Sequence, residues 1–340
     1  MNPDSGGCMM KLFKYSVILM ALCSVRSFGA EVQQTPIYIA NQNPFVQIYG
    51  LPRAEAGFAV PKGNLDVAFL YYVSNNAFSD DTGAGETMVW DGETAQYTVK
   101  VRYGLFDRLE VGMDVPYLQH SGGYLDSLIR NFHDFFSFPN DRQEEFDKNQ
   151  IDFDVNSNGS SYELKEATSG LGDIRFTAAV PLIMGSEESR RYLALRSVLK
   201  IPTGDSDDLL GSGSTDISAG LAYSDAELLD IINTALTVNL GVLYMGDSDV
   251  LGDIQKNFAG YGGVSASWLA MKRLELKLQV DLHTAMYDSD LIQLGTSLQL
   301  LAGGTLHLPG DVRLDLGISE QLSTDATPDV GFYLMVGHLF

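Results

Sequence analysis

The chain has 340 residues, and its 44 acidic and 22 basic side chains give a formal charge of −22. This negative charge argues against a protein that binds nucleic acid phosphates. Apolar residues make up 45% of the chain, but no apolar run long enough for a transmembrane helix follows residue 30, which excludes a helical membrane protein. A transmembrane β-barrel is compatible with this composition, because its strands are apolar only at every second position.

The first predicted element is an export signal. Lys11 and Lys14 form a basic start, residues 15–25 are apolar over a secretory length, and small residues follow at the spacing of a cleavage site. We therefore expect residues 1–29 to be a cleaved signal peptide, with translation starting at Met9 or Met10. An uncleaved anchor helix is the alternative.

Both cysteines, Cys8 and Cys23, lie in this segment. The exported chain would then contain no thiol and no disulfide, which suits a protein that crosses an oxidising periplasm unfolded. The next segment, residues 30–62, contains four prolines and no clear strand. We expect it either to plug a lumen or to lie in the periplasm.

From residue 63 onward the sequence alternates with a period of two, which is typical of strands with one apolar face. Over residues 95–103, alanine, tyrosine and valine occupy one face, while glutamine, threonine, lysine and arginine occupy the other. About twelve such segments can be distinguished. They start near Leu65, Thr94, Arg108, Asp173, Arg191, Thr215, Ile232, Phe258, Leu274, Ile292, Asp311 and Asp329.

The predicted connections alternate in length. Short ones cover residues 106–108, 185–190 and 271–273, and long ones cover residues 74–90, 120–170, 203–213 and 246–256. Short periplasmic turns and long outer loops are characteristic of outer-membrane barrels. We therefore predict an all-β fold, a single transmembrane antiparallel β-barrel of about twelve strands over residues 63–340, in the outer membrane of a Gram-negative cell.

The apolar faces carry essentially no charge in their central positions. In a barrel these faces meet lipid and the charged faces line the lumen, because a lipid-facing Arg or Lys at midplane costs about 2–4 kcal/mol. The lumen is then either a conducting pore or a space closed by mutual salt bridges. The predicted lumen-lining residues are Lys100, Arg102, Glu110, Asp114, Asp173, Arg175, Arg196, Lys200, Glu275, Lys277, Asp281, Arg313 and Asp315.

The last predicted strand ends the chain on an aromatic residue. Residues 330–340 alternate apolar side chains with others, and the apolar set includes Phe332 and the terminal Phe340. This pattern looks like the C-terminal signal by which barrel proteins are recognised for outer-membrane assembly. Phe332 and Phe340 are therefore the predicted assembly signal, and the barrel-assembly machinery is a predicted partner.

Several motifs resemble those of one protein family. This is an uncharacterised family of Gram-negative outer-membrane β-barrels, catalogued as a domain of unknown function. The resemblance spans nearly all of the exported chain and implies the location and the fold, but it implies no activity. The motifs are Asn41-Gln42-Asn43-Pro44, Ile48-Tyr49-Gly50-Leu51-Pro52, Gly123-Tyr124-Leu125-Asp126 with Phe132-His133, Gly170-Leu171-Gly172-Asp173, and Lys200-Ile201-Pro202-Thr203-Gly204-Asp205.

Two segments of the predicted outer loops have distinctive sequence patterns. Apolar residues three and four apart over residues 123–138 predict one short helix within the 120–170 loop. Residues 152–159 resemble the start of a calcium loop, but Lys165 stands where a bidentate glutamate is required. We therefore predict an acidic turn there and no metal site.

Enzymatic activity is not expected. A lipid-hydrolysing barrel needs a serine, a histidine and an orienting polar group on one lipid-facing edge. Of the five histidines, only His338 falls on a predicted lipid face, and no serine accompanies it. We predict no catalytic residue and no cofactor.

The favoured function is a passive or selective channel for small solutes, with specificity set by the lumen charges. Its surroundings would be outer-membrane lipid and lipopolysaccharide. The alternative is a non-conducting structural or interaction barrel that presents the 120–170 loop.

Overall fold

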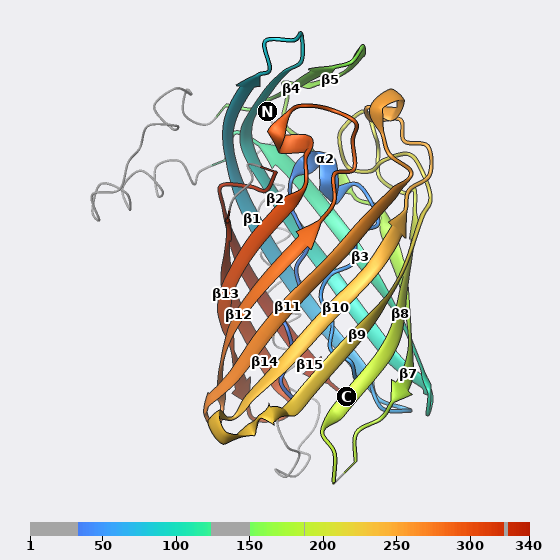
Figure 1. Ribbon diagram of the computed structural model, residues 1–340, viewed down its shortest axis with the longest axis vertical. Helices are drawn as coiled ribbons and strands as arrows, with labels where there is room; N and C mark the ends of the chain where they lie inside the picture. The colour runs from blue at the N-terminus through green and yellow to red at the C-terminus, as the bar shows by residue number, and fades with distance from the viewer. Residues whose placement is uncertain (1–32, 124–149, 187, 323–325) are drawn as a thin grey trace, which may run out of the picture.

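The computed structural model describes residues 33–123, 150–186, 188–322 and 326–340. The predicted signal peptide lies outside these residues, as does all but the first residue of the helix expected at residues 123–138. No helix in the described ranges is long and apolar enough to cross a membrane. Strands dominate the structure (Figure 1).

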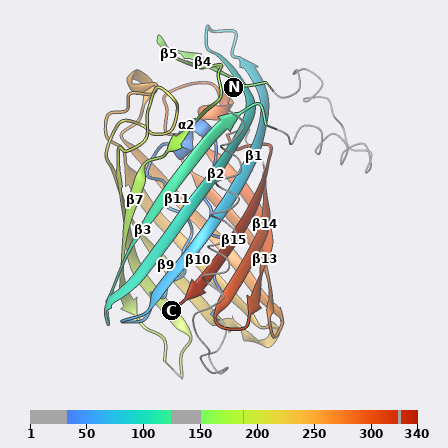
Figure 2. The same cartoon turned by 180° about the vertical axis from the view of Figure 1, so that it is seen from behind.

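Twelve strands form one closed antiparallel barrel, as predicted (Figures 1 and 2). The first strand pairs with the second and also with the last, so the sheet closes on itself. In order around the wall, the strands are β1 (Leu65–Asp81), β2 (Thr87–Phe106), β3 (Leu109–Ser121), β7 (Ile174–Ile183), β8 (Arg191–Ile201), β9 (Asp216–Leu229), β10 (Thr234–Tyr244), β11 (Phe258–Met271), β12 (Leu274–His283), β13 (Ser297–Leu308), β14 (Val312–Gln321) and β15 (Val330–Leu339).

The wall is interrupted between β6 (Thr168–Leu171) and β7, which both pair with β3. Pro116 of β3 lies opposite this break, and it has no backbone N–H to donate to a neighbouring strand. Gly172 donates its N–H to the Pro116 carbonyl at 2.9 Å. The interruption therefore lets the chain turn at Asp173.

Two predicted outer connections take a different form. Residues 74–90 were expected to form a long loop, but β1 and β2 stay paired up to Asp81 and Thr87, so that prediction was wrong. The alternation is lost there because consecutive residues of β1, from Tyr72 to Phe78, are all buried, so both faces of the strand are covered. The segment that resembles a calcium loop is a hairpin of β4 (Asp152–Ser157) and β5 (Ser160–Leu164), which extends from the outer end of β2.

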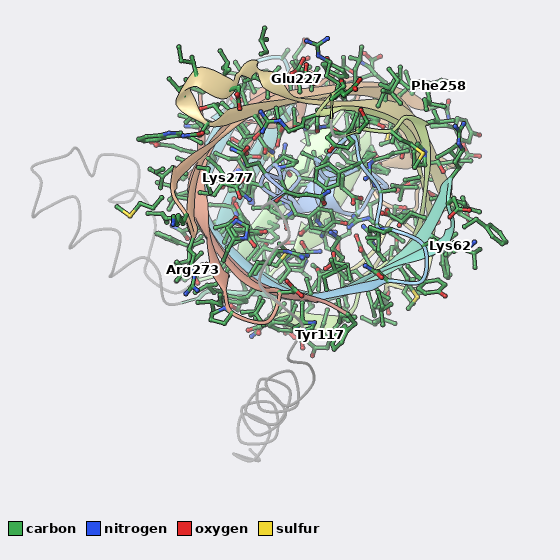
Figure 3. All side chains as sticks on the ribbon, turned by 90° about the horizontal axis from the view of Figure 1, so that it is seen from below. Lys62, Tyr117, Glu227, Phe258, Arg273 and Lys277 are labelled. Atoms are coloured by element: carbon green, nitrogen blue, oxygen red, sulfur yellow. The ribbon has the colours of Figure 1, made fainter. Side chains whose placement is uncertain are left out.

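The barrel has an apolar exterior and a polar interior. Val99, Leu276 and Leu316 are 44%, 41% and 55% exposed, whereas their neighbours Lys100 and Glu275 are buried. Seen from the end that carries the short turns, Lys277 lies inside the ring of strands, and the interior is filled with side chains (Figure 3). A water-soluble β protein has the opposite arrangement, so the exposed apolar belt is one that lipid would cover.

The last strand keeps the predicted outward register with one difference in exposure, at His338. Phe332 is half-buried, and Phe340 is 42% exposed. His338, which was expected to face lipid, lies opposite Val67 and Val312 but is 1% exposed. Its ring stacks on Phe340 with the centroids 4.1 Å apart, which covers part of it.

An apolar cluster, here called the outer core, closes the end with the long connections. It joins the short helix α2 (Pro44–Gln47) to the β4–β5 hairpin and to the connections that follow β8, β10 and β12. Representative members are Phe45, Trp90, Phe153, Leu251 and Tyr287, which are all buried. Because apolar burial is the main source of stability in protein cores, this cap holds α2 firmly under the loops.

Introducing a charged side chain on the exposed apolar belt tests whether this belt faces lipid. Leu240 lies near the middle of β10 on the exterior, and Leu228 lies at the end of β9 beside a short turn. We expect Leu240→Arg to destabilise the folded protein in lipid by about 2–4 kcal/mol, and Leu228→Arg by about 1 kcal/mol or less, because the cost falls with distance from midplane. Urea unfolding in lipid vesicles measures both, and equal losses would contradict the orientation.

Candidate functional site: the lumen and its N-terminal strap

Residues 33–62, here called the strap, run inside the barrel (blue in Figures 1 and 3). The first leg ascends along β12: Thr35 N donates to Glu275 at 3.1 Å near the start of that strand, and Asn41 contacts His283 at its end, at 2.8 Å. Helix α2 turns the chain under the outer core. The second leg then descends, and Val60 N donates to Glu110 at 2.6 Å.

The local sequence explains the turn. Asn43 caps α2 by accepting the Phe45 N–H at 2.9 Å, and Pro44 occupies the first helical position, where its missing N–H costs nothing. At the other end of the helix, the Arg175 guanidinium donates to the carbonyls of Gln47 and Tyr49 at 2.8 and 3.0 Å. The predicted lumen residue Arg175 therefore serves the backbone of the strap.

The strap is bound mainly by side chains of the wall. The Ile37 N–H and carbonyl both pair with the Gln279 side chain, at 2.8 and 3.1 Å, and Gly57 N donates to Ser224 at 2.9 Å. These bonds are not the continuous backbone ladder of a paired strand. A chain held in this way can leave without breaking the sheet.

Gly57 marks the closest approach of the strap to the wall. A Cβ atom at this position would lie 2.5 Å from the Tyr192 carbonyl and 2.8 Å from the Ala222 carbonyl, both of which are wall backbone atoms. Only glycine fits without displacing the strap from β8 and β9.

Charges from the strap and the wall meet at the centre of the barrel. Asp114 binds Arg102 of the wall at 2.8 Å and Arg53 of the strap at 3.1 Å. Glu55 of the strap lies 3.2 Å from both Arg102 and Arg196. The two arginines thus compensate the charge of the buried Glu55 carboxylate.

A second charged group lies near the outer end and is here called the outer latch. Lys200, which is fully buried, binds Asp173 at 2.8 Å and Asp216 at 3.0 Å, and it also donates to the carbonyl of Ile48 at 2.9 Å. Asp216 in turn accepts the Gly50 N–H at 2.8 Å. The outer latch therefore joins β7, β8 and β9 to the descending leg of the strap.

The remaining predicted lumen charges pair closer to the short turns. Lys277 lies 3.0 Å from Asp315 and 3.6 Å from Glu275, and Arg313 lies 2.8 Å from Asp66. Two more predicted residues join the central group: Lys100 lies 3.6 Å from Asp66, and Glu110 lies 3.2 Å from Arg196. Asp281 is the exception. It accepts a hydrogen bond from the neutral Gln279 side chain at 2.7 Å.

The strap does not fill the lumen completely. A cavity of about 60 Å³ remains between the strap and the wall, bordered by Tyr38, Arg53, Asp114, Asp281 and other side chains. Both amide atoms of Gln299, which borders this cavity, are buried without a hydrogen-bond partner within the described protein. Such atoms favour hydration, so the site is suited to water or a polar solute.

Sequence reasoning missed the strap's own contribution. Arg53, Glu55 and Tyr38 lie in irregular chain without periodicity, so no pattern assigns their direction. Asp66 and Asp216 had a usable signal, since both fall on the inward positions of their strands. The same argument from inward strand positions selected Lys100 and Lys200 as lumen residues.

Removing one partner of the outer latch tests its importance. We expect Lys200→Met to lower the free energy of unfolding by about 3–5 kcal/mol, because it leaves two buried carboxylates without their cation. Lys256→Met is the control, since Lys256 is 44% exposed and 4.0 Å from Asp288; there we expect about 1 kcal/mol or less. Urea unfolding in vesicles measures both, and a loss at Lys200 as small as that at Lys256 would contradict the latch.

Comparison with solved structures shows the same fold at low identity. The COG4313 outer membrane channel from Pseudomonas putida F1 superposes with a TM-score of 0.55 and 13% identity, covering 83% of this chain and 97% of that one. The NanC porin gives a TM-score of 0.45 and 8% identity, covering 81% and 98%. The P. putida toluene transporter TodX gives 0.39 and 11%, covering 84% and 91%.

No curated protein matches the chain. A family model matches residues 10–340, and this match confirms the resemblance found from the motifs. The chain belongs to the family described as "Protein of unknown function (DUF3187)".

Proposed function

We propose that this protein is a selective outer-membrane channel for small solutes, closed while the strap occupies its lumen. The observation that carries the proposal is the construction of the lumen. Its wall presents charged and polar side chains from β2, β3, β7, β8, β9, β12 and β14, and the strap that fills it is bound by those side chains. Without the strap, this wall is a hydrophilic passage.

The contacts of the two legs support partial release of the strap. The descending leg carries Arg53 and Glu55 and joins directly to β1, whereas the ascending leg carries no charged side chain of its own and bonds to wall groups that include Gln279, Ser267 and His283. Helix α2 is fixed under the outer core. We therefore propose that the ascending leg, residues 33–43, withdraws while α2 and the descending leg remain.

The energetic balance supports an equilibrium between closed and open states. Each buried polar atom left without a partner costs about 1–3 kcal/mol, and water entering an open lumen would satisfy the amide of Gln299, which borders the cavity. These costs offset part of the gain from the strap's hydrogen bonds. The barrel fold shared with the P. putida channel is in keeping with a pore.

The proposal includes a location and partners. The outer membrane is the location, with the acidic outer connections facing lipopolysaccharide and the barrel-assembly machinery recognising the last strand through Phe332 and Phe340. We also propose that the protein has no catalytic activity. The competing candidate remains a non-conducting barrel that presents residues 120–170.

Weakening the strap should raise conductance. In planar bilayers we expect the wild-type protein to be mostly closed, and Asn41→Ala to increase the open fraction at least about tenfold, because it removes the contacts of the ascending leg with His283, Ser297 and the Ala326 carbonyl. Gln34→Ala should act in the same direction by removing the hydrogen bonds of this leg to the carbonyls of Asn233 and Ser267. Glu188→Gln, on an exposed short turn, is the matched control and should behave as wild type.

Silence of the wild type and of both strap variants, with correctly folded barrels, would reject the channel and favour the non-conducting alternative. Heat-modifiable migration on gels reports folding independently of conductance. A fully open wild type would reject the closing role of the strap.

A further inference from the structure

The ascending leg places Tyr38 in a site that contacts every part of its side chain. The Tyr38 hydroxyl donates to Asp114 at 2.6 Å and accepts a hydrogen bond from Arg102. Lys100 Nζ lies 4.3 Å from the ring centroid, and the guanidinium carbons of Arg53 and Arg102 lie 5.4 and 5.6 Å away. Three cations and one carboxylate therefore surround a single phenol group.

The opposite side of this site is apolar, although it belongs to the lumen. Leu70 and Tyr72 of β1, Leu301 of β13, and Tyr333 and Met335 of β15 form a buried cluster with Tyr38 and its two isoleucine neighbours. An inward apolar patch is an exception on a wall that is otherwise polar. Together, the patch and the charged groups form the Tyr38 site.

The charged half of the Tyr38 site does not depend on Tyr38. Arg102 and Asp114 pair with each other at 2.8 Å, and both are held from the descending leg, by Glu55 at 3.2 Å and by Arg53 at 3.1 Å. These contacts persist when only the ascending leg withdraws. The site is therefore preorganised for another occupant of the same chemistry.

We propose that the Tyr38 site binds a small hydroxylated aromatic solute, and that Tyr38 occupies this site while the channel is closed. The inference rests on the proposed channel function and names the solute class. The cavity of about 60 Å³ borders Tyr38, Arg53 and Asp114; it has room for water but not for an aromatic ring, so the solute enters as the leg withdraws. Binding of the solute then competes with closure.

The site distinguishes a phenol from a plain aromatic hydrocarbon. The ring of either compound makes the cation–π contacts and packs against the apolar patch. A ring without a hydroxyl leaves Asp114 and Arg102 each without one hydrogen bond, which weakens binding about tenfold. p-Cresol reproduces the tyrosine side chain, and toluene is its matched analogue without the hydroxyl.

Conductance of the full-length exported protein tests whether the solute competes with Tyr38 for the site. p-Cresol should raise the wild-type open fraction at a concentration about tenfold lower than toluene does, and Asp114→Asn should reduce this preference. Tyr38→Phe should open at still lower p-cresol concentrations, because the leg then lacks its hydroxyl. Protein-free bilayers measure any direct effect of either compound on the lipid.

Direct binding separates this site from the channel proposal. Tyr38→Ala in detergent should bind 4-fluorophenol, followed by ¹⁹F NMR, about tenfold more tightly than Tyr49→Ala does. Tyr49 is an equally large, fully buried strap residue, and among the described residues no charged group hydrogen-bonds to its hydroxyl. It therefore offers a cavity of the same size without the polar recognition.

Equal binding by the two alanine variants, or equal potency of p-cresol and toluene, overturns the Tyr38 site. If Asn41→Ala conducts while these tests fail, only the solute class is rejected. If Tyr38→Ala binds selectively while no variant conducts, the site stands and the channel proposal fails. Should Tyr38→Ala not fold, an unchanged p-cresol response in Tyr38→Phe overturns the proposal instead.

Discussion

Hydrocarbon offers no hydrogen-bond partner to backbone N–H and C=O groups, and the rest of this structure depends on that constraint. It requires the sheet to close, which the pairing of β1 with β15 achieves. Closure fixes a second property, since alternate side chains of a strand point to opposite faces. With lipid outside, the apolar rows face outward, and the ionised rows are confined to a narrow interior where each charge needs a partner.

The strap supplies several of the partners that these confined charges need. Wall residues pair among themselves in part, as Lys277 and Asp315 do, but Arg175 donates to two strap carbonyls, and Arg196 depends on Glu55 as well as Glu110. The strap therefore neutralises the lumen and occludes it at the same time. Apolar burial also holds the strap, since α2 packs in the outer core and Ile37 and Ile39 cluster with apolar side chains of the wall.

Residues from three of the family motifs meet at the outer latch. Gly50 lies in one motif, Asp173 ends a second, and Lys200 begins a third, and these segments are far apart in sequence. In the folded chain Lys200 binds Asp173, while Asp216 connects Lys200 to Gly50. Asp173 also accepts the backbone N–H groups of Thr203 and Gly204 at 3.0 and 2.9 Å, which explains the glycine-rich turn of the third motif.

The sequence by itself determined the barrel, the strand number and the division between lipid-facing and lumen-facing rows, because a period of two is a local property that every strand displays. It could not determine the path of the strap, since irregular chain has no periodicity and its direction depends on partners far away in sequence, such as Gln279, which lies 242 residues from Ile37. Nor could it show that Tyr38 lies between Arg102 and Asp114, or which lumen charges pair. Those pairings follow from strand tilt, register and the strap together, and only the tertiary structure decided them.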